Sequence, residues 1–494
     1  MLLFMFAMWH FINSRRLAHW VTAIALVSPL TACGVSTIAP EGPKDAEETA
    51  VKDVAGTEAN ETGTNKTAGD DAEEGSQGEV NATSNAPEVP EGSTLVGWRT
   101  DDGQLLQPDG ADAASTEATK LTAVHHPNEA IEITLENVRA GTHAANHGFP
   151  LDIDGLTLAV GAPHTDVAGV PSGSVDVLSW DGSSWRSEAR LTVQDANDTP
   201  GADTFGASVD VADERLAVGA PLANNQQGAT YLFEKRRGSW SHTQTLVSPN
   251  PTHLALFGAD IAMAGNRLFV TESPLEADAK VHLYELDAEG TWRWTTSFGH
   301  NHAPQGSRID RVVADGNTVA FIGEPRSATT PPNGVSINTW DGGVWNADTV
   351  DIPGGARPWS LGLDGDRLVV GVLESNCAYA YQREARGQWV AASPALMACG
   401  SEAEHPRAGF AVAVAGAHVA VGDNAANASR GEVLGFRDTG AGWSSVQVAG
   451  GGDGGWAGTT LAMNEHLLVT GRGVLGGPED TVVATVQPTA ALFD

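Results

Sequence analysis

The chain has 494 residues and carries 62 acidic against 28 basic side chains, which gives a formal net charge of −34. This balance excludes nucleic acid as an expected partner, because a phosphate backbone is bound by a basic surface. The length allows several ordinary domains or one large all-β domain.

The chain opens with the pattern of a secretory signal peptide. Arg15 and Arg16 precede residues 17–30, a mostly apolar run that is shorter than the roughly 20 apolar residues of a membrane-spanning helix. The run ends in Leu30-Thr31-Ala32-Cys33, which resembles the lipobox of bacterial lipoproteins. The resemblance implies cleavage before Cys33, lipidation of its thiol and anchoring in the cell envelope. Gly34 stands where an aspartate would retain a lipoprotein at the inner membrane, which favours the outer membrane or cell surface. The alternative is an ordinary signal peptide followed by a chance cysteine.

Residues 34–92 contain no aromatic residue and no apolar periodicity. Within them, residues 41–92 carry 14 acidic side chains and 3 lysines. A segment of this composition cannot bury enough apolar surface to offset the entropy lost on ordering. We predict a disordered acidic tether over 34–115, between the signal peptide (1–33) and a folded domain (116–494).

From residue 147 onward the sequence repeats itself with a period near fifty. The phrase FGASVDVADERLAVGAP at 205–221 has six weaker relatives, and the aligned position near the end of the phrase falls at 161, 219, 271, 323, 371, 422 and 471. Such a period is typical of a propeller blade or another β array. Seven copies predict an all-β fold, a seven-bladed β-propeller, in which radial repetition leaves only short protected edges.

Each repeat is predicted to form four short strands. In the second repeat 208–211 alternates in polarity, Asp213-Glu214 suits a tight turn, and 216–218 is continuously apolar, as in a buried central strand. A third strand follows, and a fourth begins with a tryptophan. That tryptophan recurs as Trp185, Trp240, Trp292, Trp345, Trp389 and Trp443. Its regular placement favours packing between blades over carbohydrate stacking.

The seventh repeat has a third strand at 481–486 but no fourth strand after it. We predict that a strand from before the first repeat fills this place and closes the ring. The segment 119–124 resembles the fourth strand of the first repeat, so it is predicted to pair with 482–486. On this hypothesis a chain truncated to residue 130 loses much stability, whereas one truncated to residue 93 loses little.

Two phrases of the second repeat, Phe205-Gly206 and Gly219-Ala220-Pro221, resemble the FG-GAP repeat of integrin α chains and many bacterial surface proteins. The resemblance covers roughly 147–475 and implies a β-propeller that serves as a platform for protein recognition. Integrin-type blades often carry a calcium loop built from several oxygen ligands. Here 152–155 and 364–366 offer two carboxylates each in short segments, and we expect ordinary turns with no bound metal.

Beyond Cys33 the chain has two cysteines, Cys377 and Cys399, which fall in one predicted hairpin. In an oxidising compartment, an even number of cysteines besides Cys33 favours a disulfide between these two. Two buried free thiols are the alternative.

No catalytic or cofactor-binding constellation stands out in the sequence. It has no Gly-x-Ser-x-Gly elbow, and the close histidines, His125-His126 and His300-x-His302, lie in predicted loops and make half a zinc site at most. We therefore expect a non-enzymatic propeller for binding, adhesion or scaffolding on an anchored extracytoplasmic lipoprotein, with a protein or glycan ligand on its loops. The alternative is a hydrolase or lyase that acts on an envelope or extracellular polymer through the central channel.

Overall fold

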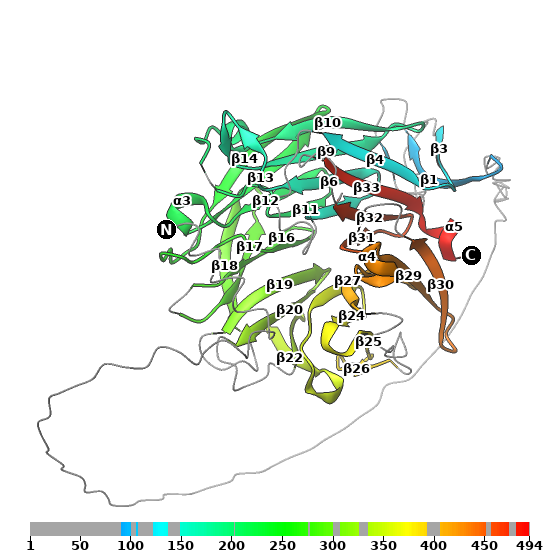
Figure 1. Cartoon of the computed structure of the whole chain (residues 1–494). Helices are drawn as coiled ribbons and strands as arrows, with labels where there is room; N and C mark the ends of the chain where they lie inside the picture. The colour runs from blue at the N-terminus through cyan, green and yellow to red at the C-terminus, as the bar shows by residue number, and fades with distance from the viewer. Residues whose placement is uncertain are drawn as a thin grey trace, which may run out of the picture. The chain divides into compact units, whose positions relative to one another are not determined.

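The computed structural model describes residues 90–99, 105–106, 122–136 and 149–493, with gaps in the last range at 202, 275–276, 300–306, 326–333, 393–405, 451–455 and 474–480 (Figure 1). The chain divides into two units, Met1–Ala82 and Thr83–Asp494, and every described residue belongs to the second. The predicted signal peptide, Cys33, most of the predicted tether and Cys399 lie outside the described residues. None of the helices in the described ranges is long and apolar enough to cross a membrane.

Seven four-stranded antiparallel sheets make up most of the described chain (Figure 1). From the innermost strand outward, blade 1 consists of β5 (Leu151–Asp154), β6 (Thr157–Ala162), β9 (Ser174–Trp180) and β10 (Trp185–Leu191), and blade 2 of β11 (Ser208–Ala212), β12 (Arg215–Ala220), β13 (Ala229–Arg236) and β14 (Ser239–Leu246). Blade 3 consists of β15 (Ile261–Ala264), β16 (Arg267–Glu272), β17 (Lys280–Leu286) and β18 (Trp292–Gly299), and blade 4 of β19 (Ser307–Asp315), β20 (Thr318–Pro325), β21 (Gly334–Trp340) and β22 (Trp345–Asp351).

Blades 5 to 7 continue the same order with β23 (Ser360–Asp364), β24 (Arg367–Val372), β25 (Cys377–Arg383), β26 (Trp389–Ala391); β27 (Ala408–Ala415), β28 (His418–Asp423), β29 (Glu432–Asp438), β30 (Trp443–Gly450); and β31 (Thr460–Met463), β32 (Leu467–Gly473), β33 (Thr481–Pro488), β4 (Ile131–Glu136). The innermost strands contact one another in succession, and β31 contacts β5, so the sheets close into a ring. The predicted seven-bladed β-propeller is confirmed.

Short elements lie between the strands. They are the two-stranded hairpin β7 (Asp166–Val167) and β8 (Val170–Pro171), the helices α3 (Ala223–Gln226), α4 (Ala426–Ser429) and α5 (Thr489–Phe493), and the 3-10 turns η2 (Val193–Ala196), η3 (Pro353–Gly355) and η4 (Leu373–Ser375).

The second strand of each blade is apolar throughout because each sheet has a neighbour on both faces. Leu216, Ala217 and Val218 of β12 are fully buried. Leu216 and Val218 pack with residues of blade 1 such as Val177, whereas Ala217 packs with residues of blade 3 such as Leu268. A strand covered on both sides has no polar face to present to solvent, which is the origin of the continuous apolar run.

The ring is closed by an N-terminal strand, but the predicted segment was wrong. β4 pairs with β33 in the register Val482 with Leu135, and it completes blade 7. The described part of 119–124 belongs instead to β3 (Thr122–Pro127), which pairs with β1 (Ser93–Arg99). The physical reason is that apolar and polar residues alternate along β4, which reads Ile-Glu-Ile-Thr-Leu-Glu. Successive side chains of a strand point to opposite faces, so Ile133 and Leu135 are both buried in the core.

A small sheet of β1, β2 (Leu105–Leu106) and β3 covers the seam between blades 7 and 1. Val96 and Val124 share one apolar cluster with Leu135 of blade 7 and Leu178 of blade 1. Both β1 and β2 lie within 34–115, the range assigned to the tether, so part of that range belongs to the folded domain. The sparse apolar residues there gave too weak a pattern for a strand prediction.

His125 and His126 lie in β3 and not in a loop. The Trp180 indole N–H donates to the His125 carbonyl at 2.9 Å. The Trp185 indole donates to Nε2 of His126 at 3.3 Å, so this nitrogen carries no proton in that contact. Burial lowers the pKa of His126, which favours the neutral ring. The pair therefore joins the small sheet to blade 1.

The tryptophans pack between blades, as predicted. Trp345 of blade 4 lies 5.1 Å from the ring of Phe298 in blade 3, centroid to centroid. The Trp240 indole of blade 2 donates to Glu188 of blade 1 at 3.0 Å. The guanidinium of Arg267 in blade 3 lies 5.3 Å from the Trp345 ring, a cation–π contact across the same junction.

Three glycines meet at the junction between blades 2 and 3. A Cβ atom on Gly219 would lie 2.1 Å from the carbonyl oxygen of Gly258, and one on Gly228 would lie 2.1 Å from that of Phe257. Gly258 itself has a φ of +84°, a conformation that favours glycine. The same arrangement recurs at two further junctions with Gly161, Gly173 and Gly206 and with Gly422, Gly431 and Gly458. The repeated phrases thus bring the backbones of neighbouring blades into contact.

Candidate functional site

The propeller has two faces that differ in their connections. On one, here called the hairpin face, the turn between the first two strands of a blade has two residues in blades 1 to 6 and three in blade 7. On the other, the loop face, the connections range from 373–376, between β24 and β25, to 192–207, between β10 and β11. Binding residues are commonly carried on varied loops held by a rigid scaffold, so the loop face is the candidate binding surface.

Polar contacts join the turns of the hairpin face from blade to blade. Five hydrogen bonds of 2.7 to 3.0 Å link turns of neighbouring blades. The donor and acceptor pairs are Asp213 to Asp154, Arg215 to Asn266, Arg267 to Asn317, Gly365 to Asp315, and Asn464 to Gly155. Asp154 and Asp364, both from segments considered for calcium, accept backbone N–H groups of the next blade. Their carboxylates therefore link blades.

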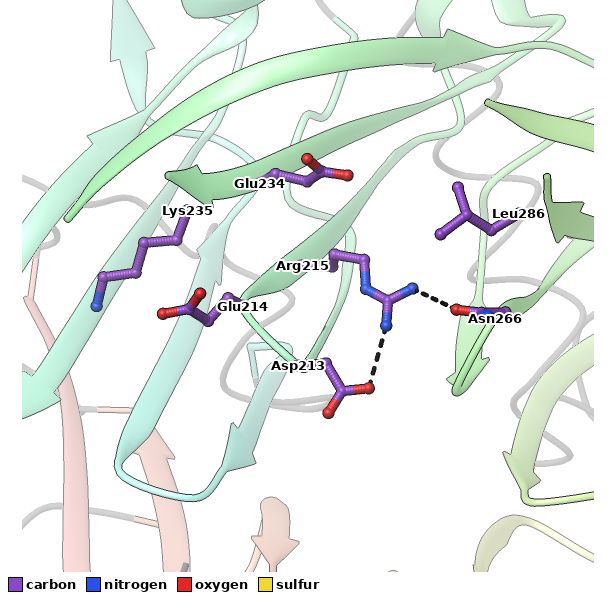
Figure 2. Close-up of a pocket in the computed structure, with 7 residues that line it drawn as sticks. All are labelled: Asp213, Glu214, Arg215, Glu234, Lys235, Asn266 and Leu286. Carbon is purple, nitrogen blue, oxygen red and sulfur yellow. Dashed lines mark hydrogen bonds and ion pairs between the residues drawn. The ribbon is translucent and has the colours of Figure 1, made fainter. Parts of the chain in front are cut away.

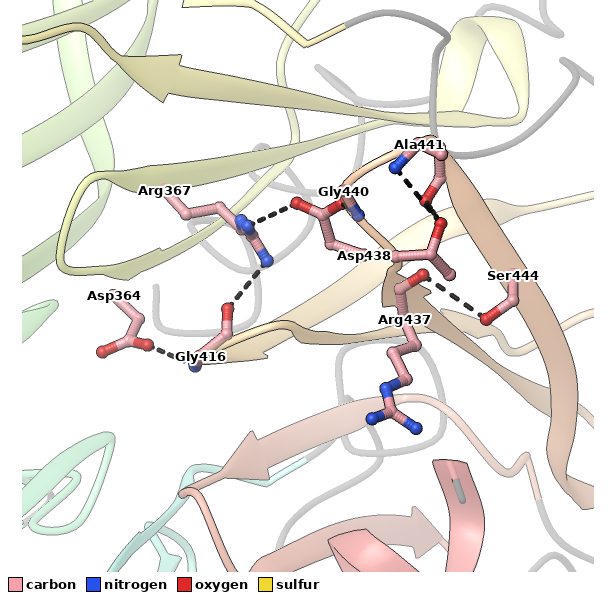
Figure 3. Close-up of polar contacts among 10 residues, drawn as sticks. Asp364, Arg367, Gly416, Arg437, Asp438, Gly440, Ala441 and Ser444 are labelled. Carbon is pink, nitrogen blue, oxygen red and sulfur yellow. Dashed lines mark hydrogen bonds and ion pairs between the residues drawn. The ribbon is translucent and has the colours of Figure 1, made fainter.

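Arg367 shows how one such junction is built (Figure 3). Its Nη1 donates to the carbonyl of Gly416 at 2.8 Å, and its Nη2 donates to Asp438 at 2.7 Å. The guanidinium also lies 5.2 Å from the ring of Trp443. Asp364 accepts the N–H of the same Gly416, so the turns of blades 5 and 6 are held by contacts in both directions.

A shallow pocket of about 290 Å³ lies on the hairpin face at the junction of blades 2 and 3 (Figure 2). It is lined by Asp213, Glu214, Arg215, Glu234, Lys235, Asn266 and Leu286. Its cations already have partners: Arg215 contacts Asp213 at 3.1 Å, and Lys235 contacts Glu188 of blade 1 at 2.6 Å. The pocket therefore has the composition of an inter-blade ion-pair network, with little apolar surface for a ligand.

Three aspartates of blades 1 to 3 each accept a backbone N–H from the innermost strand of the next blade. Val211 donates to Asp152 at 2.8 Å, Met263 to Asp210 at 3.1 Å, and Val312 to Asp260 at 2.8 Å. Desolvation by the surrounding protein raises the pKa of Asp152 and of Asp260 to about 6. It raises the pKa of Asp210 as well, and the nearby Asp152 charge adds to that rise. The negative charge on each of these three carboxyls therefore opposes folding of the ring.

The propeller is expected to be more stable at pH 5 than at pH 7.5. The folded-state pKa of these carboxyls lies above the ordinary value of 3.8, so between pH 4 and 6 the folded state binds protons that the unfolded chain does not. Stability therefore rises as the pH falls through this window, and between pH 7.5 and 5 the gain is on the order of 1 kcal/mol for Asp152 or Asp260. Calorimetric melting at both pH values measures the effect.

Two substitutions separate this effect from general charge repulsion. Asp210→Asn keeps an oxygen that can accept the Met263 N–H, and it should raise the melting temperature at pH 7.5 and flatten its pH dependence. Asp181→Asn is the control, because hydrogen bonds from Ser183 and Arg186 to an exposed carboxylate lower the pKa of Asp181. An unaltered pH slope in Asp210→Asn would contradict the assignment.

One turn of the loop face has an unusual backbone. Asn224, Asn225 and Gln226 in α3 have φ values of 52°, 58° and 67°, which cost non-glycine residues about 1–2 kcal/mol each. The N–H groups of Leu256 and Phe257, ahead of β15, donate to the carbonyls of Gln226 and Gln227 at 3.3 and 3.0 Å. The turn is thus held by the chain leading into the next blade, with Asn224 and Asn225 exposed at its tip.

The predicted lipidation and disulfide sites are only partly within the described chain. Cys33 and Cys399 lie outside it. Cys377 begins β25, is fully buried and is disulfide-bonded. Its pairing with Cys399 stays a prediction. Sequence reasoning missed the inter-blade roles of Asp210 and Asp260, which depend on strand register between repeats and carry no local motif.

The family match falls on the second repeat. A family model for the FG-GAP repeat matches residues 185–233. The protein is a seven-bladed β-propeller with an FG-GAP repeat at residues 185–233. The match runs from Trp185 in β10 to Phe233 in β13, so the matched segment consists of the last strand of blade 1 and the first three strands of blade 2. A ring of such repeats needs its last strand from the N-terminal side, which is the position of β4.

Solved structures similar to this FG-GAP propeller include the WD40 repeats of RRP9, at 12% identity and a TM-score of 0.45, over 69% of this chain and 95% of that one. A chain of the mitotic checkpoint complex has 13% identity and a TM-score of 0.46, over 72% of this chain and 90% of that one. No curated protein matches the sequence.

Proposed function

We propose that this propeller belongs to a membrane-anchored lipoprotein, and that its loop face is a non-catalytic binding surface that holds a protein or glycan partner. The observation that carries the proposal is the contrast between the two faces. The hairpin face has short turns of two to five residues, and turns of neighbouring blades are joined by polar contacts. The loop face has connections of very different lengths on the same rigid ring, which suits recognition of a specific partner.

Blocking each face in turn tests the binding role. Asn225 and Glu214 are matched sites, because both are exposed and have positive φ values of 58° and 59° on opposite faces of blade 2. Each is replaced by cysteine and coupled to a bulky polyethylene glycol. The labelled proteins are then compared as bait for partners from envelope extracts. The label at Asn225 should abolish capture of a partner that the unlabelled protein holds, whereas the label at Glu214 should not. Equal capture by both would count against the loop face.

Anchoring is tested at Cys33. Replacing Cys33 with serine removes the thiol that the lipobox resemblance marks for lipidation. Incorporation of a fatty-acid analogue should then be lost, and the protein should move from the membrane fraction to the soluble fraction. The double substitution Cys377→Ser/Cys399→Ser is the control, because it leaves the lipobox intact and should keep the label. Labelling that survives Cys33→Ser would refute the anchor.

A further inference from the structure

Blade 3 holds a hydrogen-bonded serine, histidine and glutamate on three adjacent strands. Glu272 ends β16, His282 lies in β17, and Ser297 lies opposite His282 in β18. Ser297 Oγ is 2.8 Å from Nδ1 of His282, and Glu272 Oε2 is 2.5 Å from its Nε2. The histidine and glutamate side chains are 2% and 7% exposed, whereas Ser297 is half-buried on the outermost strand.

The hydrogen bonds have a consistent direction. An ionised carboxylate only accepts hydrogen bonds, so Nε2 of His282 carries a proton and donates to Glu272. Nδ1 of the neutral ring is then an acceptor, and the Ser297 hydroxyl donates to it. The Trp294 indole N–H donates to Ser297 Oγ at 3.1 Å. The serine proton is therefore directed to a base that is itself oriented by a carboxylate, the arrangement that activates a hydroxyl nucleophile.

A bulge and the exposed Trp294 side chain define the surroundings of Ser297. The β17–β18 register shifts at Thr295, and the extra residue brings Trp294 to the same side of the strand as Ser297. Trp294 is 47% exposed. Val247 is 48% exposed, and its carbonyl accepts the hydroxyl of Tyr284, the strand partner of Trp294. Trp294 thus places an exposed apolar ring beside the Ser297 hydroxyl.

Blade 2 offers a natural comparison at the same place. Thr245 lies opposite Tyr231 in β14, as Ser297 lies opposite His282. Its Oγ1 is 2.9 Å from Nε2 of His242, across the bulge of that strand. His242 has its other hydrogen bond with the backbone of Gln244. The hydroxyl–histidine pair is therefore present in both blades, and the carboxylate-oriented ring belongs to blade 3.

We propose that Ser297 is an activated nucleophile that accepts an acyl group from esters with an apolar acyl chain, with His282 as the base and Glu272 as a positioning residue. Ser297 Oγ forms a bond to the acyl carbon while its proton passes to Nδ1 of His282. The bond from that carbon to the ester oxygen breaks, and the departing alcohol takes the proton from Nδ1. The indole N–H of Trp294, released from Oγ, can donate to the oxygen on which negative charge develops. This site lies on the rim of blade 3 and goes beyond the binding role of the loop face.

The test uses a fluorophosphonate probe and p-nitrophenyl butyrate on the purified full chain. Ser297 should be labelled by the probe, and butyrate ester should form on it with release of nitrophenol. Ser297→Ala should lose both signals. His282→Gln should react about 100-fold more slowly or worse, the usual loss for a general base. Glu272→Gln should change the pH profile of labelling, a readout that a purely structural role would leave unmoved.

Thr245→Ala is the matched control and should label as the parent does. Melting curves establish that each variant is folded, and Trp294→Phe provides a second, milder variant that should slow labelling without removing the nucleophile. A folded parent whose Ser297 stays unlabelled at millimolar probe would overturn the proposal, as would labelling that is undiminished in folded His282→Gln. Neither outcome bears on anchoring or partner capture, which are measured on the Ser297→Ala variant separately.

Discussion

A chain that begins at residue 137 is expected to lose its folded ring. It lacks β4, so β33 loses a paired strand along Thr481 to Val486 and the core loses Ile133 and Leu135. Removing one buried Ile or Leu side chain typically costs about 2–5 kcal/mol, and total stability is commonly about 5–15 kcal/mol. Thermal unfolding and size-exclusion chromatography should show loss of the cooperative transition and association through the exposed edge of β33.

A chain that begins at residue 131 is the control for this experiment. It keeps β4 and, among the described elements, loses the small sheet of β1, β2 and β3, with the contacts of Val96, Val124, His125 and His126. It should melt cooperatively at a lower temperature than the parent. A peptide of residues 130–136 added to the shorter chain should restore part of its stability. Equal melting temperatures for chains that begin at 131 and 137 would show that β4 does not close the ring.

Gly219→Ala is expected to destabilise the propeller by about 3 kcal/mol or more. The new methyl group would lie 2.1 Å from the Gly258 carbonyl oxygen and 2.2 Å from Ser208 Oγ. Serine can rotate away, but the carbonyl is backbone and can move only if blades 2 and 3 separate. Chemical denaturation of the two proteins measures the difference in the free energy of unfolding.

Gly299→Ala in β18 is the matched control for that substitution. A Cβ at Gly299 meets no atom within 4 Å, and the residue has no positive φ. Its free energy of unfolding should change by about 0.5 kcal/mol or less. If both alanines cost the same, the contact between the glycines of neighbouring blades is not what the repeated phrase supplies.

Local pattern was enough to predict the blades. The turn at Asp213-Glu214 and the apolar run at 216–218 are each decided within a few residues, so the strands of the second repeat lie where the sequence placed them. The need for a closing strand also followed from counting strands in the repeats. The identity of that strand did not follow, because 119–124 and 131–136 both resemble fourth strands and the choice depends on contacts with β33, far away in the chain.

The candidate site was less accessible to sequence reasoning. Asp152 was noticed for its turn, but its carboxylate accepts an N–H from Val211 in the next blade, a contact set by ring geometry. Glu272, His282 and Ser297 match no motif, since they come from three strands and meet through register and a bulge. The tryptophans were predictable because their spacing repeats. A contact that is made at only one place in the ring leaves no repeating pattern in the sequence, so it could not be predicted in this way.

The pairing of β4 with β33 also sets the timing of folding. Glu136 meets Thr481, so the pair joins two segments that are 345 positions apart in the sequence and leave the ribosome at widely separated times. Strand contacts of such high separation form slowly, since a long loop must close before they bring any gain. Until β33 arrives, β4 has no partner strand and its Ile133 and Leu135 have no core to enter. The chain is then most exposed to proteases and to pairing with other copies, so a holding chaperone would act on this half-finished ring and not on the closed one.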